Sequence, residues 1–298
     1  MTTKSLPASN QKLWFAALKP PMYSVAVIPI WVGSAIAWSN QKYLNLPVFW
    51  TFLGAAILIV AWLNLTNDVF DADTGIDVNK PHSLVNLTDN QALIFWLANS
   101  LLGLGCLGIL AIAWWQQDLT VLALVFLSCF LGYTYQGPPF RLGYQGLGEI
   151  ICFFTFGPLA VSAAYYSQTQ SWSSPSLAAS IIIGFSTSLI LFCSHFHQVD
   201  DDIAAGKRSP VVRLGTQRGA QLLPWICGIT LSLVGVFTVF DLLPLGALLA
   251  LASLPLAIQL CQHVANFHNQ PDQVKNCKFI AVAFHFVSGI LLGIGVLA

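Results

Sequence analysis

The sequence predicts an all-α protein that crosses a membrane many times. Hydrophobic residues make up 56% of its 298 residues and charged residues only 8%, which is more apolar surface than one soluble core can bury. No linker or shift in composition divides the chain, so we expect one integral-membrane domain over residues 1–298. The formal net charge is zero, so there is no basic field that would recruit nucleic acid, and no obligate protein partner is evident.

Nine apolar segments are long enough to cross a hydrocarbon core about 30 Å thick. In chain order they cover residues 22–39, 46–66, 91–114, 119–135, 147–166, 178–196, 220–240, 243–262 and 279–297. The sequence therefore predicts nine transmembrane helices. Ala35-Ile36-Ala37 alternatively resembles a signal-peptide cleavage site, but the long region before it is untypical of a signal. The seven cysteines are scattered, and we expect them to be small buried hydrophobes.

The positions of Lys and Arg predict which side of the membrane each loop faces, because these residues accumulate on the cytoplasmic side. If the N-terminus is cytoplasmic, only Lys42 lies outside. The other eleven cations then lie inside: Lys4, Lys12, Lys19, Lys80, Arg141, Lys207, Arg208, Arg213, Arg218, Lys275 and Lys278. One missed helix would move all later loops to the opposite side and remove this bias. The bias therefore supports both the nine helices and a cytoplasmic N-terminus.

The second apolar segment runs directly into the acidic stretch NLTNDVFDADTGID, which begins at Asn64. At about 100° per residue, four of its polar residues share one helical face: Asn64, Asn67, Asp68 and Asp71. Asp73 points to the far side. Gly75 predicts the end of the helix, so Asp77 is expected to return from the following loop.

A second acidic stretch, HFHQVDDDIAAGKRSPVVRLG, begins at His195 at the end of the sixth apolar segment. On a helix, four of its residues share one side: His195, Gln198, Asp201 and Asp202. Asp200 faces away, and Lys207, Arg208 and Arg213 follow. Both stretches are expected on the cytoplasmic side, at the same membrane depth, so the two carboxylate-bearing faces can lie opposite each other.

Aspartates near the hydrocarbon are costly, at roughly 2.5–3.5 kcal/mol each for a helix centre. Carboxylate and amide oxygens suit a hard cation such as Mg²⁺, which takes its remaining ligands from substrate phosphates. The two stretches therefore predict a Mg²⁺ diphosphate site, with the downstream cations neutralising outer phosphate oxygens. The alternative is that these acids are solvated helix ends. Two clusters on one side, with basic residues beside one of them, favour the site.

A third segment, GYTYQGPPFRLGYQGLGE, joins the fourth and fifth apolar segments on the same side. Its Tyr133, Tyr135 and Tyr144 are candidates to place rings over a cation or an aromatic substrate, and Arg141 to meet an anion. Each is otherwise an interfacial aromatic or a loop anchor. Glu149 begins an apolar helix, and an intramembrane acid is a functional candidate by default.

These three stretches, together with the FFTFGPLAV that follows the third, resemble the signatures of the UbiA superfamily of intramembrane prenyltransferases. The resemblance runs from Trp14 to Arg213, and it is particularly similar to the branch that prenylates 1,4-dihydroxy-2-naphthoate. It implies nine helices around a central cavity, in a cell inner or thylakoid membrane with the site opening to the cytoplasm. It also implies two Asp-rich motifs that bind Mg²⁺ and a prenyl diphosphate.

Carried over by position, the family motif N-D-x-x-D falls on Asn67, Asp68 and Asp71, with a trailing acid at Asp77. The second family motif, D-x-x-x-D before G-K, falls on Gln198 and Asp202. Gln198 replaces the first Asp, so either its amide oxygen is a ligand or Asp201 takes over. The string HFHQVDDDIAAGKRSP is similar to the cyanobacterial and plant form, which transfers a phytyl chain for phylloquinone.

The residues and the resemblance together give the following expected roles. The catalytic acids are Asp68, Asp71, Asp202 and Glu149. Substrate and diphosphate bind Asn64, Lys207, Arg208, Arg213, Tyr133, Tyr135, Arg141 and Tyr144. The Mg²⁺ ligands are drawn from Asn67, Asp71, Asp77, Gln198, Asp201 and Asp202.

The implied reaction joins a phytyl group to 1,4-dihydroxy-2-naphthoate with loss of CO₂ and diphosphate. Alternatives within the family are polyprenyl transfer to the same acceptor, as for menaquinone, and prenylation of homogentisate or 4-hydroxybenzoate. A cation-coupled transporter would place acids near helix centres, whereas these acids cluster at helix ends. A CDP-alcohol phosphotransferase would carry D-G-x-x-A-R, which is absent from the sequence.

Overall fold

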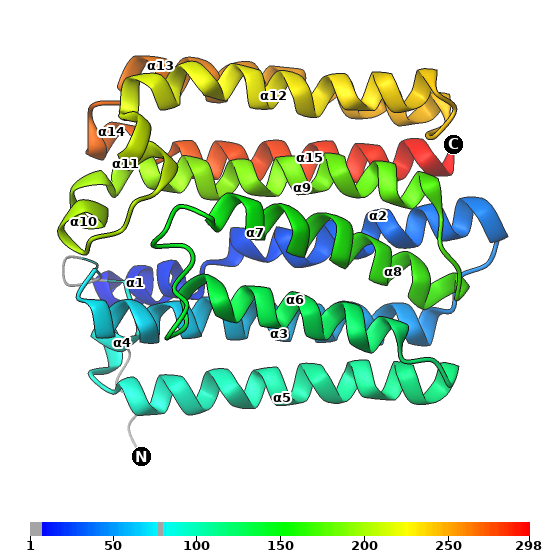
Figure 1. The fold of residues 1–298 in the computed structure, drawn as a ribbon, viewed down its shortest axis with the longest axis horizontal. Coiled ribbons are helices and arrows are strands. Elements are labelled where there is room, and N and C mark those ends of the chain that lie inside the picture. The colour runs from blue at the N-terminus through cyan, green and yellow to red at the C-terminus, as the bar shows by residue number, and fades with distance from the viewer. Residues whose placement is uncertain (1–7, 77–79, 81) are drawn as a thin grey trace.

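The computed structural model of the protein describes residues 8–76, 80 and 82–298, and within these ranges it contains helices and connections but no strand. The long helices lie side by side along one axis (Figure 1). The first half of the chain forms α1 (Ala8–Leu18), η1 (Pro20–Tyr23), α2 (Ser24–Gln41), α3 (Leu46–Thr74), α4 (Leu84–Thr88), α5 (Gln91–Gln116), α6 (Thr120–Gln136) and α7 (Gly148–Phe154). The second half forms η2 (Thr155–Leu159), α8 (Ala160–Thr169), α9 (Ser174–Ser194), η3 (His195–His197), α10 (Val199–Ala204), α11 (Pro210–Leu214), α12 (Thr216–Val239), η4 (Leu245–Ser253), α13 (Leu254–Phe267), α14 (Pro271–Val274) and α15 (Cys277–Leu297).

Eight helical stretches of the described chain are long and apolar enough to cross a membrane: Lys12–Gln41, Leu46–Thr74, Gln91–Gln116, Gly148–Thr169, Ser174–His197, Thr216–Val239, Leu245–Phe267 and Pro271–Leu297. The fourth predicted segment corresponds to α6, which has 17 residues and is apolar but shorter. Each of the nine predicted segments thus lies in or largely overlaps one of these helical stretches. The all-α class is confirmed, while nine crossings and a cytoplasmic N-terminus stay predictions.

The interior consists of three apolar clusters that together join the long helices. One lies mainly between α3, α5, α6 and α8, a second between α9, α12, α13 and α15, and a third between α2, α9, η4 and α15. Large apolar side chains such as Trp96, Trp114 and Trp225 point outward and are more than two-thirds exposed. A membrane protein needs such an outer surface, because lipid tails take the place of water around it. The seven cysteines are free; four of them are buried, as expected, and the other three are half-buried.

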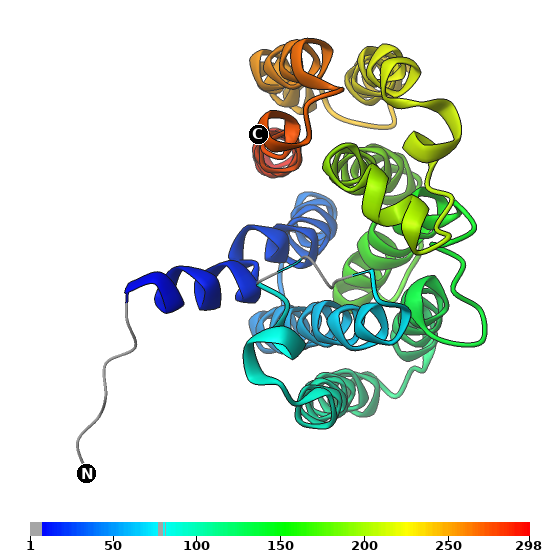
Figure 2. The same cartoon turned by 90° about the vertical axis from the view of Figure 1, so that its left-hand side faces the viewer.

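The acidic and aromatic stretches meet at one end of the bundle. The connections after α3, α6 and α9 lie at the left-hand end in Figure 1 and face the viewer in Figure 2. The connections after α2, α5, α8 and α12 lie at the opposite end. Successive long helices run in opposite directions along the bundle (Figure 1), so segments far apart in sequence become neighbours at this end.

The second acidic stretch is not one continuous helix, although the predicted common side of its residues assumes one. Helix α9 ends at Ser194, a single 3₁₀ turn covers His195–His197, and α10 begins at Val199. Gln198 lies between them with φ −117° and ψ 14°. This break turns the chain, so α10 directs its acids independently of α9.

Candidate active site

Asp71 is held by residues from the third segment. Its Oδ1 accepts a hydrogen bond from Gln136 Nε2 at the end of α6, and Tyr144 Oη donates to the same oxygen at 3.4 Å. Tyr144 Oη also lies 2.6 Å from Thr74 Oγ1. Burial and the charge of Asp71 raise the pKa of Tyr144, so the hydroxyl keeps its proton. The loop between α6 and α7 therefore folds over the first acidic stretch.

Asp68 is fully buried, and both of its carboxylate oxygens have protein partners. Lys19 Nζ lies 2.9 Å and Lys80 Nζ 3.4 Å from Oδ1. The backbone N–H of Leu84 donates to Oδ2 at 3.0 Å. Asp68 thus ties the region before α2 and the connection before α4 to α3. Sequence reasoning missed Lys19 and Lys80 as partners, although both were among the cations assigned to the same side.

Asp202 is also fully buried and lies in a second charged cluster. His195 Nδ1 is 3.1 Å from its Oδ2, and Lys207 Nζ is 3.5 Å from its Oδ1. Burial alone would raise the pKa of Asp202, but the hydrogen bond from His195 and the charge of Lys207 outweigh it and hold this pKa below its usual value. The carboxylate therefore stays charged in the fold. The contact with His195 was not anticipated from the sequence.

Glu149 extends this cluster toward the third segment. His195 Nε2 lies 3.5 Å from Glu149 Oε1, so the imidazole stands between two acids. Lys207 Nζ also lies over the Tyr144 ring, 5.7 Å from its centre. Tyr144 therefore touches the first stretch through Asp71 and the second through Lys207.

Tyr135 lies between the two acidic stretches, within electrostatic reach of Asp71, Glu149 and Asp202. Its ring packs against Gly143 and Gly148, where an added Cβ would come within 2.5 and 2.7 Å of it. These glycines leave the room that the ring needs. The structure thus brings together Asp71, Glu149, Asp202, Lys207, Tyr135 and Tyr144.

Other predicted residues have different surroundings. Arg213 is exposed, and it donates to the carbonyl oxygens of Arg208 at 3.0 Å and of Gln145 at 2.7 Å. The Arg208 side chain is exposed as well. Tyr133 donates to the Pro138 carbonyl at 2.7 Å. Arg213 and Tyr133 therefore brace loops through these hydrogen bonds, and their roles at the diphosphate stay predictions.

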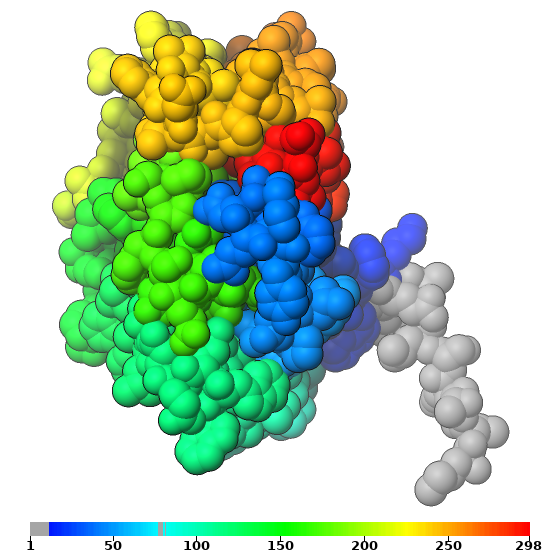
Figure 3. Space-filling model, turned by 90° about the vertical axis from the view of Figure 1, so that its right-hand side faces the viewer, coloured from blue at the N-terminus to red at the C-terminus, as the bar shows by residue number. Residues whose placement is uncertain are grey.

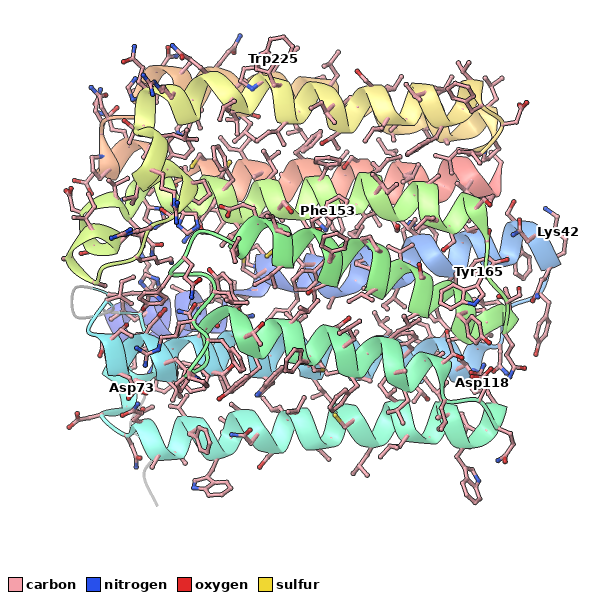
Figure 4. All side chains as sticks on the ribbon, in the orientation of Figure 1. Lys42, Asp73, Asp118, Phe153, Tyr165 and Trp225 are labelled. Carbon is pink, nitrogen blue, oxygen red and sulfur yellow. The ribbon has the colours of Figure 1, made fainter. Side chains whose placement is uncertain are left out.

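The remaining predicted positions divide by exposure. Half-buried side chains are those of Asn64, Asn67, Arg141, Gln198 and Asp201. Asp200 is exposed, and exposed Asp73 accepts a hydrogen bond from Gln91 Nε2 at 2.6 Å. Asp73 lies at the left-hand end of Figure 4. Asp77 lies outside the described residues.

An apolar cavity with an empty volume of about 500 Å³, part of which is open to the outside, lies between α2, α3, α6 and the η2–α8 segment. Its lining includes Val25, Ile30, Phe52, Ala56, Ile59, Leu63, Val125 and Phe156. Ser128 and Thr155 are its two polar residues, and Thr155 Oγ1 is buried without a hydrogen-bond partner in the described chain. Such a cavity suits a hydrocarbon chain.

The donor atoms near the acids fit Mg²⁺. Among the described residues, Gln136 Oε1, both Glu149 carboxylate oxygens and Asp202 Oδ1 are buried without a hydrogen-bond partner. Hard oxygens of this kind are the ligands Mg²⁺ prefers. No three His, Cys, Asp or Glu side chains of the described chain form a complete metal-binding group by themselves. Amide and phosphate oxygens would have to complete the coordination.

The sequence pattern of the UbiA prenyltransferase family matches residues 26–288. The chain belongs to this family. This UbiA-family protein is 56% identical over 297 residues to 2-carboxy-1,4-naphthoquinone phytyltransferase of Synechocystis, covering 98% of the chain and 95% of that relative. It is 40% identical over 292 residues to the chloroplastic 2-carboxy-1,4-naphthoquinone phytyltransferase of Arabidopsis thaliana, covering 95% of the chain and 76% of that relative.

A solved structure of a UbiA homologue from Archaeoglobus fulgidus, bound to DMAPP and Mg²⁺, superposes on the UbiA-family protein with a TM-score of 0.61. The two are 15% identical, and the match covers 94% of this chain and 98% of the other. At this identity the likeness shows the fold alone. It agrees with the all-helical bundle, and the many apolar helices make the protein an integral, multi-pass membrane protein.

Proposed function

We propose that the protein transfers a phytyl group from phytyl diphosphate to the carboxylated ring carbon of 1,4-dihydroxy-2-naphthoate, as a step of phylloquinone synthesis. Support comes from the two naphthoquinone phytyltransferases that match nearly the whole chain. The observation that carries the proposal is the meeting of Asp71 and Asp202 through Tyr144 and Lys207. It provides a place for a diphosphate at one end of a bundle that also holds an apolar cavity.

The metal would be held by ligands drawn from both stretches, namely Asn67, Asp71, Gln198, Asp201 and Asp202, with Asp77 as a further candidate. Mg²⁺, when bound there, supplies positive charge that offsets the charge on the departing diphosphate. Lys207 is nearly buried beside Asp202, so its ammonium group adds to that charge in a site of low dielectric constant. The protonated Tyr144 hydroxyl is a further donor.

Asp68 has a positioning role in this proposal. Its oxygens already accept from Lys19, Lys80 and the Leu84 backbone, so it holds two lysines at the site and leaves metal binding to Asp71. The charges of these lysines lie on the side of α3 where the diphosphate is expected.

The apolar cavity receives the phytyl tail and keeps water from the allylic cation. The rings of Tyr135 and Tyr144 lie near the cation's expected position and stabilise its charge. Neither carboxylate oxygen of Glu149 accepts a hydrogen bond from the described residues, although His195 Nε2 lies 3.5 Å from Oε1. Glu149 accepts a hydrogen bond from a hydroxyl of the acceptor, which raises electron density on the attacked ring.

The bond changes balance without an added oxidant. The C1–O bond of phytyl diphosphate breaks, the ring carbon bonds to C1, and the carbon–carboxylate bond then breaks to release CO₂ and restore aromaticity. The relatives are named for the oxidised acceptor, 2-carboxy-1,4-naphthoquinone. We propose that the dihydroxy form reacts here, because its ring is richer in electrons than the quinone ring.

The test is to incubate membranes containing the protein with Mg²⁺, each acceptor form and either phytyl or all-trans polyprenyl diphosphate. Products are identified by mass. We expect phytyl transfer to the dihydroxy acceptor. A product from polyprenyl donors only would overturn the phytyl donor, a product from the quinone only would overturn the acceptor form, and no prenylated naphthoquinone from any pair would overturn the whole proposal.

Within this proposal the site opens to the cytoplasmic side of a cell inner or thylakoid membrane. The cations on the acid-bearing end support this side.

A further inference from the structure

A second hollow lies at the opposite end of the bundle from the acids. It lies between the end of α8 and the start of α9, and it has an empty volume of about 760 Å³, part of which is open to the outside. Tyr165, which lines it, is at the right-hand end of Figure 4, away from Asp73. Figure 3 shows that end of the molecule. No residue proposed for catalysis lines this hollow.

Hydroxyl groups make up most of the hollow's polar wall. They belong to Ser162, Tyr165, Ser173, Ser174 and Ser176. None of the residues that line the hollow is an Asp, Glu, Lys, Arg or His. A hydroxyl both donates and accepts hydrogen bonds, so this wall complements a neutral ligand with several hydroxyls. A charged group would find no opposite charge among the lining residues.

Ser176 indicates that the hollow is built to bind. Its side chain is only 2% exposed, yet its Oγ has no hydrogen-bond partner in the part of the chain that the structure describes. Buried hydroxyls in folded proteins are normally paired, because an unpaired one destabilises the fold. The Ser176 backbone N–H is already used, since it donates to Ser173 Oγ at 3.3 Å. The side-chain hydroxyl is therefore free to bond a ligand in the hollow.

Tyr165 adds a second hydroxyl with a fixed position. Its Oη accepts a hydrogen bond from Asn40 Nδ2 at 3.0 Å, so its own proton is oriented away from Asn40. The ring of this side chain is buried at 5% exposure. Tyr165 and Ser176 thus offer two polar contacts from different helices.

Trp172 supplies an aromatic surface at the mouth of the hollow. It is 64% exposed, and its ring packs at a tilt against Tyr166, with centres 5.2 Å apart. A tryptophan ring offers an apolar face beside polar groups, which is the surface that the CH face of a sugar ring covers. Leu177, in the first turn of α9, is 52% exposed beside it. The combination is apolar at the outer edge and rich in hydroxyls within.

The position of the hollow favours a ligand anchored in the membrane. The hollow lies at the connection between two helical stretches that can each cross a membrane, Gly148–Thr169 and Ser174–His197. Their connection therefore lies where such helices leave the hydrocarbon and meet the headgroups. A headgroup can enter from the side while its acyl chains stay in the surrounding lipid.

We propose that this hollow binds the neutral sugar headgroup of a membrane glycolipid. The sugar ring covers Trp172, and its hydroxyls bond Ser176 and Tyr165. This site is separate from the proposed prenyl-transfer site, so a test of one does not decide the other.

The test uses the full chain reconstituted in three kinds of vesicle: phosphatidylcholine alone, phosphatidylcholine with monohexosyl diacylglycerol, and phosphatidylcholine with phosphatidylglycerol. Lipid binding is followed by the unfolding temperature and by native mass spectrometry. We expect the monohexosyl lipid to raise the unfolding temperature and to remain bound. Trp172→Ala and Ser176→Ala should each weaken this binding by about tenfold or more, as for the loss of a central contact in an interface.

Trp114→Ala is the matched control, because Trp114 is an exposed tryptophan near the end of α5 on the same side and does not line the hollow. It should leave glycolipid binding unchanged. Both test variants are safe for folding, since Trp172 is largely exposed and Ser176→Ala removes an unpaired hydroxyl. Equal stabilisation by phosphatidylglycerol would overturn the proposal in favour of an anion at the start of α9. Unchanged glycolipid binding by both test variants would also overturn it.

Discussion

The Nδ1 atom of His195 lies 3.1 Å from Oδ2 of Asp202, and both side chains are buried. The same ring approaches Glu149 through its other nitrogen, at 3.5 Å. A ring held in this way fixes the direction of the Asp202 carboxylate, as outer partners do for metal-binding carboxylates. We therefore infer that His195 is a positioning residue.

His195→Ala should lower Mg²⁺ affinity by roughly 10–100-fold, the usual cost of losing such a partner. Binding of Mn²⁺ as a substitute ion, followed by electron paramagnetic resonance, measures this without turnover. His195→Asn can still donate near Nδ1 and should restore part of the affinity. His263→Ala, on α13, serves as the control. Equal ion binding by His195→Ala and the wild type would rule out the positioning role.

Asp71→Asn should reduce Mg²⁺-dependent turnover by on the order of 100-fold, because a neutral amide is a poorer ligand than a carboxylate. Gln136 and Tyr144 can still bond the amide oxygen, so the fold should survive. Product formation is measured across a range of Mg²⁺ concentrations. Asp200→Asn is the control, since Asp200 is exposed and should tolerate the change. Full turnover by Asp71→Asn would remove it from the metal site.

Asp68→Asn should destabilise the protein more than it changes metal binding. The substitution leaves Lys19 and Lys80 without the buried charge that pairs them, and breaking such a pair costs about 3 kcal/mol. Thermal unfolding in detergent measures the loss. The matched control is Asp73→Asn, five residues along the same helix, where the carboxylate is exposed. If both variants unfold at the wild-type temperature, the proposed brace is absent.

Ala56→Phe should fill part of the apolar cavity beside Phe52 and Ile59. We expect KM for phytyl diphosphate to rise roughly tenfold or more, because one or two displaced methylenes already cost that much in an apolar pocket. A short donor such as dimethylallyl diphosphate should react as before. Gly103→Ala, on α5, is the control, because an added Cβ at this position meets no atom within 4 Å. An equal loss with both donors would place the tail elsewhere.

His82 should make stability depend on pH. Burial and the charges of Lys80, Lys278 and Lys19 lower its pKa, against the opposing effect of Asp68. The unfolded chain therefore takes up a proton near the ordinary value of about 6.5, whereas the folded chain resists it. The stabilisation is complete above that pH and is lost as the pH falls toward the lowered value.

The unfolding temperature should accordingly fall between pH 7 and pH 5 by more in the wild type than in His82→Gln. Parallel curves for the two proteins would contradict the assignment. His268→Gln, which removes a histidine bonded to Thr216, tests whether the effect is specific to His82.

The sequence by itself determined the long apolar helices and the end of the bundle that carries the acids. In a membrane each spanning helix must satisfy its own backbone hydrogen bonds and turn apolar side chains to lipid or to the protein interior, so hydropathy alone marks the long apolar helices. The far-side placement of Asp73 also followed from helical geometry, because α3 continues to Thr74. The placement of Gln198 and Asp201 did not, because α9 ends before them.

Only the tertiary structure decided which polar side chains became partners. Lys19 reaches Asp68 across 49 positions of the chain, and Gln136 reaches Asp71 across 65. Arg213, which the sequence predicts at the diphosphate, donates to two loop carbonyls that lie 5 and 68 positions away. Hydropathy and helical spacing describe one helix at a time, whereas these contacts depend on how helices pack and where their ends meet. A buried charge in a medium of low dielectric constant takes whichever partner that packing brings within reach.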